Sequence, residues 1–344
     1  MHALSRIAAA GAALAALSLT ACTNKGAETG PAGGEATPPP APKVTAKLTE
    51  PPVPKEAVPS APSKKPYKIG VSLLTRDDEF YKTLEQGLND EARKQNVTVT
   101  IESGDKDLNK QINQVQNFVA QKEDAIVLCP VDSQGVTAAV TAANNANIPV
   151  FTADIASKGG KVISHIASDN VQGGRLVGDY AAKTVLSGKG NVAILDLSTV
   201  TSVQDRVKGF KEALAKYPNI KIIADQDVEG AKRENAVPKA TDLLTAHPDL
   251  NLIFGINDPV ALGALSALQQ ANKKDIAVVG FDAIPEAQTY IASGNSPLKA
   301  DAIQYPHVIG VTTIDAIVKS LNGEAVPPVI PVPTGLVTPD SFKK

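Results

Sequence analysis

From residue 67 onward, short β-branched runs alternate with longer segments of helical periodicity, and this alternation constrains the fold more than any other feature. The apolar runs are almost unbroken, which is typical of strands buried on both faces of a parallel sheet. Strands that alternate with helices of this length predict βαβ units. The predicted strands are 68–74, 97–101, 125–128, 148–152, 162–167, 191–197, 220–224, 252–256 and 276–281, and the predicted helices include 80–95, 110–121, 134–146, 173–186, 203–217, 233–246 and 260–271.

The regular part of the chain, 67–344, is as long as the upper limit of about 250–300 residues for a single hydrophobic core. We therefore predict an α/β protein with two lobes, each built on a doubly wound parallel sheet. Ligands of such sheets bind just beyond the carboxyl ends of the strands. Asp154, which follows the run 148–152, is the first candidate for a binding residue.

The first 21 residues predict an export signal. Arg6 precedes an apolar run, 7–19, that is shorter than the roughly 20 residues a membrane-spanning helix needs. Residues 19–22, LTAC, resemble the bacterial lipobox, in which the chain is cut before the cysteine and the cysteine is lipidated. The only other cysteine is Cys129, so the chain has no disulfide framework, and we expect Cys22 to carry a lipid. An ordinary cleaved signal is the alternative.

Residues 22–66 differ sharply in composition from the rest of the chain. They are rich in Pro, Ala, Gly, Lys, Glu and Thr and contain few large apolar side chains. Such a segment buries too little surface to fold alone, so we predict a lipidated Cys22 followed by an extended, disordered tether. A Pro-rich motif that binds a partner is the alternative.

The charge pattern and the known catalytic motifs exclude several classes of protein. The net charge is −2, and Lys and Arg are interspersed with Asp and Glu, which argues against nucleic-acid binding. The four histidines are not at metal-ligand spacing, and the sequence has no nucleophile elbow, phosphate-binding loop, zinc-protease motif or dinucleotide fingerprint. We therefore expect no enzyme activity, cofactor or metal.

Two stretches carry a resemblance to a known family. Residues 164–170 read SHIASDN and are followed by a Gly-Gly pair at a predicted helix start, and residues 245–268 read TAHPDLNLIFGINDPVALGALSAL. Both resemble the ribose-binding branch of the periplasmic sugar-binding proteins, and the similarity extends over about 67–338. The resemblance implies two lobes joined by a hinge of three crossings, one of which follows Gln304, with a return near 333–336. The implied N-terminal lobe is 67–168 plus 305–333, and the C-terminal lobe is 169–304 plus 334–344.

The candidate binding residues follow predicted strands or begin predicted helices. A sugar hydroxyl both donates and accepts hydrogen bonds, and the C–H faces of a sugar pack on aromatic rings, so carboxylates, amides, guanidinium groups and aromatics suit it. By resemblance, the adjacent aromatics after the first strand stack on the sugar, although one ring could belong to the core. Asn257 and Asp282 could instead cap the helices that follow them. The predicted ligand-binding set is Asp78, Phe80, Tyr81, Asp154, Arg206, Asn257, Phe281, Asp282 and Gln304.

Three positions depart from the ribose-binding pattern. Ile155 stands where that branch has Arg, Cys129 stands where it has Asn, and Gly230 lies near the position of a stacking Phe. Ile155 cannot supply the paired donors of a guanidinium group. Cys129 is interpreted as a buried structural thiol. These losses favour a different pentose, a hexose or a polyol over ribose.

The resemblance implies a monomeric, lipid-anchored receptor, exported to the periplasm or cell surface, that binds a small neutral sugar or polyol and delivers it to an ABC permease. A second possibility is a receptor that presents a sugar or quorum signal to a membrane sensor without import. A sugar-responsive repressor shares the two-lobed core, but an export signal and a Pro-rich segment occupy the place of its DNA-binding helices.

Overall fold

The computed structural model describes residues 45–343 of the chain, in two six-stranded sheets. The predicted export signal, Cys22 and the first half of the predicted tether lie outside the described residues. In the first sheet every pair of neighbouring strands is parallel, and its strands in spatial order are β11 (Val329–Val332), β5 (Val162–Ser168), β4 (Val150–Ala153), β3 (Ala125–Leu128), β1 (Lys68–Leu73) and β2 (Thr98–Ser103).

The second sheet repeats this order and differs at one edge, where β12 is antiparallel. In each sheet the chain reverses its direction of winding next to the first strand, and this reversal point is where open α/β sheets bind ligands. The strands of the second sheet in spatial order are β12 (Gly335–Val337), β10 (Leu298–Ile303), β9 (Ala277–Asp282), β8 (Leu250–Gly255), β6 (Lys189–Asp196) and β7 (Asn219–Asp227).

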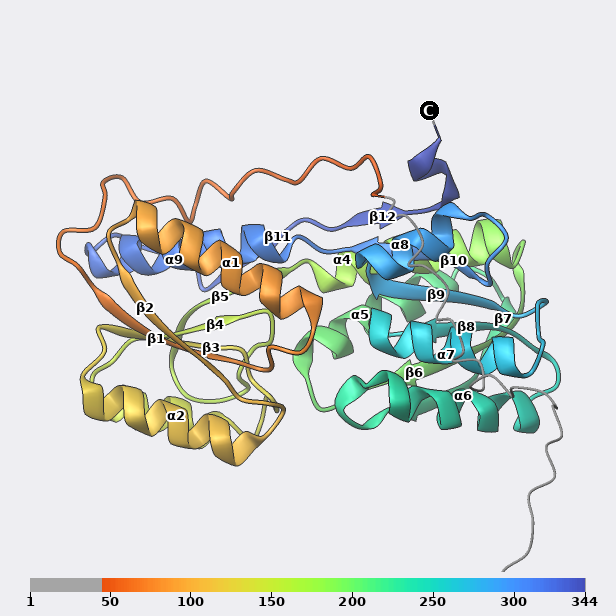
Figure 1. The fold of residues 1–344 in the computed structure, drawn as a ribbon, viewed down its shortest axis with the longest axis horizontal. Coiled ribbons are helices and arrows are strands. Elements are labelled where there is room, and N and C mark those ends of the chain that lie inside the picture. The colour runs from red at the N-terminus through yellow and green to blue at the C-terminus, as the bar shows by residue number, and fades with distance from the viewer. Residues whose placement is uncertain (1–44, 344) are drawn as a thin grey trace, which may run out of the picture. The chain divides into compact units, whose positions relative to one another are not determined.

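Helices cover both faces of the sheets, as the strand–helix alternation predicts. Figure 1 shows two helices of the first lobe, α1 and α9, packed together above its sheet, with α2 below it. The first-lobe helices are α1 (Glu79–Lys94), α2 (Leu108–Gln121), α3 (Thr137–Asn145) and α9 (Pro306–Leu321). The second-lobe helices are α4 (Asn170–Tyr180), α5 (Thr201–Leu214), α6 (Arg233–Ala246), α7 (Asp258–Gln270) and α8 (Pro285–Ala292), with short turns at Ala181–Val185, Glu229–Ala231 and Pro339–Phe342.

Each lobe has its own hydrophobic core. The core of the second lobe is one large cluster, and the core of the first lobe consists of two clusters. The chain passes between the lobes three times, from β5 to α4, from β10 to α9 and from β11 to β12. The prediction of two parallel-sheet lobes is confirmed.

A close helix contact in the second lobe requires glycine. A Cβ atom at Gly174 in α4 would lie 2.1 Å from the carbonyl oxygen of Arg206 in α5, a separation that real Cβ atoms do not show. The absence of a side chain lets the two helix backbones approach closely. Gly174, the second residue of the Gly-Gly pair that carried the resemblance, therefore lets α5, which carries the predicted binding residue Arg206, pack closely on α4.

Residues 45–66, here called the strap, are ordered against both lobes, so the disordered tether predicted through residue 66 is wrong for this part. At one end, the Ala46 amide donates to Gln288 Oε1 of the second lobe at 2.6 Å. At the other end, Ala57 is fully buried in the first-lobe core, and the Asn322 carboxamide donates to the Ala61 carbonyl at 3.1 Å. Figure 1 shows the strap as the orange trace above α9.

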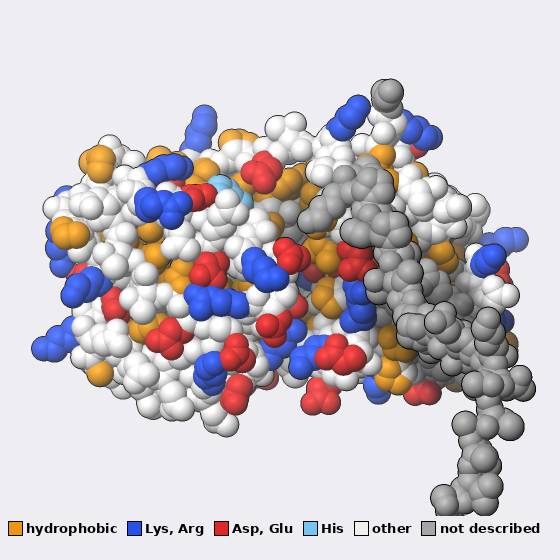
Figure 2. Space-filling model, in the orientation of Figure 1, with side chains coloured by type: hydrophobic (Ala, Val, Ile, Leu, Met, Phe, Trp, Pro, Cys, Tyr) orange, Lys and Arg blue, Asp and Glu red, His pale blue; other side chains and the backbone are white. Residues whose placement is uncertain are grey.

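The surface agrees with the charge pattern of the sequence. Basic and acidic side chains are interspersed on the face that Figure 2 shows. Within residues 45–343, no helix combines the length and the apolar character that crossing a membrane requires.

Candidate functional site

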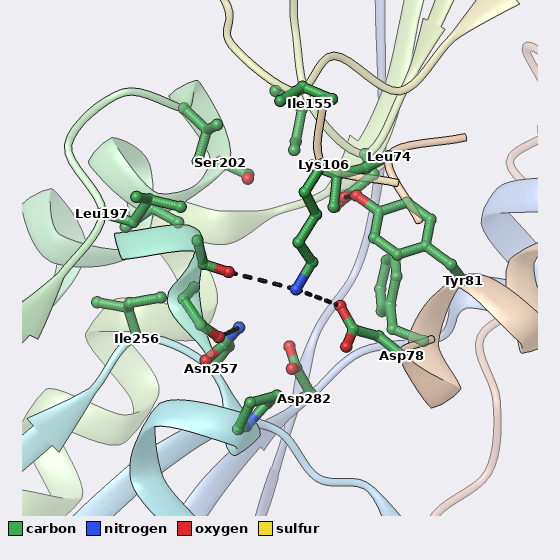
Figure 3. A pocket seen from close by; sticks show the side chains of 18 of the residues that line it. Leu74, Asp78, Tyr81, Lys106, Ile155, Leu197, Ser202, Ile256, Asn257 and Asp282 are labelled. Carbon is green, nitrogen blue, oxygen red and sulfur yellow. Dashed lines mark hydrogen bonds and ion pairs between the residues drawn. The ribbon is translucent and has the colours of Figure 1, made fainter. Parts of the chain in front are cut away.

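A cavity of about 580 Å³ lies between the two lobes, at the carboxyl ends of the strands. Segments that follow β1, β2, β3 and β4 line it from the first lobe, and segments that follow β6, β7, β8, β9 and β10 line it from the second. Eight of the nine predicted binding residues are among its lining, and Figure 3 shows part of it. The eight are Asp78, Phe80, Tyr81, Asp154, Arg206, Asn257, Asp282 and Gln304.

Asp154 follows β4 in a strained backbone conformation. Its φ of 64° is in the left-handed region that non-glycine residues rarely adopt, and such strain is concentrated at functional sites. Its Oδ2 accepts a hydrogen bond from the Tyr81 hydroxyl at 2.5 Å, whereas its Oδ1 has no partner among residues 45–343. Burial raises the pKa of the Asp154 carboxyl, and the charge of Arg206 partly opposes this.

The two adjacent aromatics lie in the first turn of α1. The rings of Phe80 and Tyr81 meet edge to face with their centroids 5.2 Å apart. Both belong to the first-lobe core and both line the cavity, so core packing and ligand contact are compatible for each ring. Asp78 is the N-cap residue of α1, but its side chain makes no capping hydrogen bond and faces Lys106 instead.

Arg206 is held rigidly in the second lobe. Its Nε donates to Asn170 Oδ1 and its Nη1 to the Ile256 carbonyl, both at 2.9 Å. Its guanidinium lies 4.1 Å from the centroid of the Phe281 ring, a distance at which a cation is attracted to the ring face. Phe281 is fully buried and is not part of the cavity lining, so the structure places it against Arg206 and outside the cavity.

Asp282 and Gln304 form a pair behind this arginine. Gln304 Nε2 donates to Asp282 Oδ1 at 2.6 Å, and Gln304 Oε1 has no partner within the described part of the chain. Asp282 also has a left-handed backbone, with φ of 116°. Burial raises the pKa of the Asp282 carboxyl to about 8, although Arg206, at 3.4 Å, favours the charged form.

Asn257 combines two roles. Its Oδ1 accepts a hydrogen bond from the Val260 amide at 3.0 Å, which caps the N-terminus of α7. The same residue lines the cavity, with its Nδ2 3.5 Å from the Ala231 carbonyl oxygen. The capping alternative and the ligand alternative therefore do not exclude each other.

The sequence analysis missed Lys106, which crosses the cavity. Its φ of 59° is left-handed, and its side chain extends between the lobes. The ammonium lies 3.3 Å from Asp78 of the first lobe and donates to the Gly230 carbonyl of the second lobe at 3.2 Å. A lysine just before a helix gives no sequence signal that would distinguish it from a solvated surface residue.

Further hydrogen bonds join the lobes beside the cavity. The Ala156 amide of the first lobe donates to Thr201 Oγ1 at 2.9 Å, and the Thr201 amide donates to Ser133 Oγ at 3.1 Å. These bonds and the Lys106 contact define a closed arrangement of the two lobes.

The three departures from the ribose-binding pattern differ in their surroundings. Ile155 lines the cavity, and Gly230, with φ of 62°, also lines it and supplies the carbonyl that Lys106 binds. Cys129 is fully buried and is not part of the lining, and burial raises the pKa of its thiol well above the usual value. His165 pairs with Thr152 in the first sheet, and burial lowers its pKa to about 4.

Comparisons with known proteins agree with this architecture. The family model of the periplasmic binding protein domain matches residues 69–325. The ribose import binding protein RbsB of Escherichia coli is 36% identical over 271 residues, which cover 78% of this chain and 90% of that protein. A solved ABC transporter solute binding protein from Mycobacterium smegmatis with bound glycerol is 33% identical, with a TM-score of 0.76 over 80% of this chain and 95% of that one.

A second solved structure, the Caulobacter myo-inositol binding protein with bound myo-inositol, is 28% identical, with a TM-score of 0.75 over 82% of this chain and 97% of that one. These homologues are solute-binding proteins and not enzymes, and periplasmic binding proteins are exported. The family model and these homologues match most of the chain, including both lobes. The chain therefore belongs to the periplasmic binding protein family, with ribose-binding proteins among its homologues.

Proposed function

We propose that this chain is the substrate-binding component of an ABC importer and that it binds a small neutral sugar or polyol between its lobes. Two buried acceptors support the proposal most directly. Asp154 Oδ1 comes from the first lobe and Gln304 Oε1 follows a strand of the second, and neither has a partner among the described residues. A buried acceptor without a partner costs about 1–3 kcal/mol, so a ligand whose hydroxyls donate to both is stabilised there.

The same arrangement supports binding by hinge closure. A ligand that contacts Asp154 of one lobe and Arg206 of the other interacts with both only when the cleft is closed. The ligand therefore binds the closed state more tightly than the open state and shifts the protein toward the closed state. A permease that distinguishes the closed from the open form would then receive only loaded protein.

The membrane anchor is the second part of the proposal. The motif at residues 19–22 supports lipidation of Cys22, which would hold the exported protein at a membrane near its permease. Metabolic labelling with a radioactive fatty acid should mark the full-length chain and not a Cys22→Ser variant. Equal labelling of the two would contradict the anchor and leave the binding function untouched.

Isothermal titration of the full-length protein with pentoses, hexoses and polyols tests the binding function. At least one ligand should bind, and Asp154→Asn should weaken its binding about tenfold or more, because an amide turns one carboxylate acceptor into a donor. Asparagine tolerates the left-handed backbone and can still accept from Tyr81, so the fold should be retained.

Asp315→Asn is the matched control. Asp315 is a buried carboxylate of the same lobe that bonds to Gln95 and does not line the cavity. Its substitution should leave the affinity unchanged. If no sugar or polyol binds, or if both variants weaken binding equally, the proposed site is wrong.

A further inference from the structure

One side of the cavity is apolar and is built from both lobes. Ile155 of the first lobe belongs to the core cluster of the second lobe, together with Val200 and Ile256. Leu74 and Leu197 pack against the same cluster. All five of these residues line the cavity, and they are called the apolar wall below.

Part of this wall lies across the cavity from two of the polar binding residues. In Figure 3, Leu74 and Ile155 are on the opposite side of the cavity from Asn257 and Asp282, and Lys106 extends between the two sides. Ser202 contributes a hydroxyl beside the wall. The cavity therefore offers one ligand a mainly hydrophobic region around Leu74 and Ile155 and a hydrogen-bonding region around Asn257 and Asp282, with the wall residue Ile256 beside Asn257.

The cavity is also spacious. Its volume of about 580 Å³ lies within the range of roughly 300–1,000 Å³ that is typical of sites for drug-sized ligands. A ligand can therefore reach the apolar wall while its hydroxyls contact Asp154, Arg206 and Asp282.

A hydroxyl and a methylene group of a ligand that contact this wall have opposite effects on its binding affinity. A hydroxyl that loses its water there without gaining a partner weakens binding roughly 5- to 150-fold, equivalent to about 1–3 kcal/mol. A methylene group buried there strengthens binding about fourfold, equivalent to about 0.8 kcal/mol. The wall thus selects against a ligand that is hydroxylated all round.

We propose that the ligand is a sugar or polyol with an apolar part, such as a deoxy position or an alkyl or aryl substituent, which packs on the apolar wall. This inference rests on the proposed function and specifies the ligand class of the same site. The hydroxylated part of the ligand binds Asp154, Arg206 and Asp282, and the apolar part contacts Ile155 and its neighbours.

Calorimetric titration of the full-length protein with matched pairs of ligands tests the proposal. Each pair consists of a parent sugar and its methyl or butyl glycoside, or of a hexose and its 6-deoxy form. In at least one pair the apolar member should bind about tenfold tighter or more. Ile155→Thr, which places a hydroxyl in the wall, should reduce this preference about fivefold or more.

Ile163→Thr is the control, because Ile163 packs on the first-lobe core and does not line the cavity. It should leave the preference unchanged. If parent sugars bind and their apolar partners bind equally or more weakly in every pair, the apolar subsite is wrong and the sugar-binding function stands. If no member of any pair binds, the proposed function itself is wrong. The ligand series on the unmodified protein decides these outcomes even if Ile155→Thr fails to fold.

Discussion

Replacing Lys106 by Met should open the cleft of the ligand-free protein. The hydrogen bond from Lys106 to the Gly230 carbonyl joins the two lobes, whereas the pair with Asp78 stays within the first lobe in either arrangement. A hydrogen bond from a charged donor contributes about 1.5–3 kcal/mol, and the 3.2 Å length and partial exposure of this one place it near 1.5 kcal/mol. The ratio of closed to open protein should therefore fall about tenfold.

Small-angle X-ray scattering of the ligand-free, full-length variant measures this change as a larger radius of gyration. The affinity for a bound sugar should weaken by a similar factor, because the ligand must then supply more of the energy of closure. Lys110→Met is the matched control, since Lys110 pairs with Asp105 of its own lobe and, among residues 45–343, with no group of the other lobe. If Lys106→Met scatters like this control, the contact with Gly230 does not stabilise closure and the reasoning fails.

Two further predictions concern the second lobe. Gly174→Ala should destabilise the protein by about 1–3 kcal/mol in urea unfolding, because the added methyl group meets the Arg206 carbonyl oxygen. It should also weaken ligand binding. Unchanged stability would show that α4 and α5 can separate without cost. Burial raises the pKa of Asp282 and of Asp301 to about 8, so between about pH 4 and pH 8 each holds a proton in the folded state that it loses on unfolding. The free energy of unfolding relative to Asp301→Asn should therefore fall as the pH rises through this range, by up to about 1.4 kcal/mol per pH unit, and a difference that is flat or rises would contradict the assignment.

Most of the fold follows from the sequence because buried strands and amphipathic helices have different periods. The nine strands predicted by the pattern all have counterparts in the two sheets. The pattern did not predict β10, β11 and β12, and the last two are short edge strands of four and three residues. Pro331 lies in β11, and a proline is tolerated at a sheet edge but argues against a strand in a sequence pattern.

The candidate site was predictable to the extent that its residues follow strands. Asp154 and Asn257 come directly after buried runs, so their place at the cavity agrees with strand geometry. Lys106 was missed because its direction depends on a left-handed backbone, which local sequence does not specify for lysine. The position of Phe281 beneath Arg206 was also missed, since a residue at the end of a strand points to one face or the other according to register.

The order of the strap could not be predicted from composition. Several of its contacts with the body involve small side chains and backbone groups, such as Ala57 in the first-lobe core and the Ala61 carbonyl that accepts from Asn322. Neither helix and strand propensities nor the hydrophobic pattern of the sequence reveals contacts of these two kinds. The partners of Ala46 and Ala61 are also more than 240 residues away in the sequence, so no local pattern connects them.

The strap changes how mechanical load would enter the protein. In sequence order, the chain before Tyr67 leads directly into β1 of the first lobe, so a pull from the N-terminal side would be expected to act there. The hydrogen bonds of Ala46 to Gln288 and of Lys47 to Ser341 instead transmit such a pull to the second lobe. As long as these bonds hold, the second lobe is the stationary part under tension, and the first lobe is the one that swings when the cleft opens.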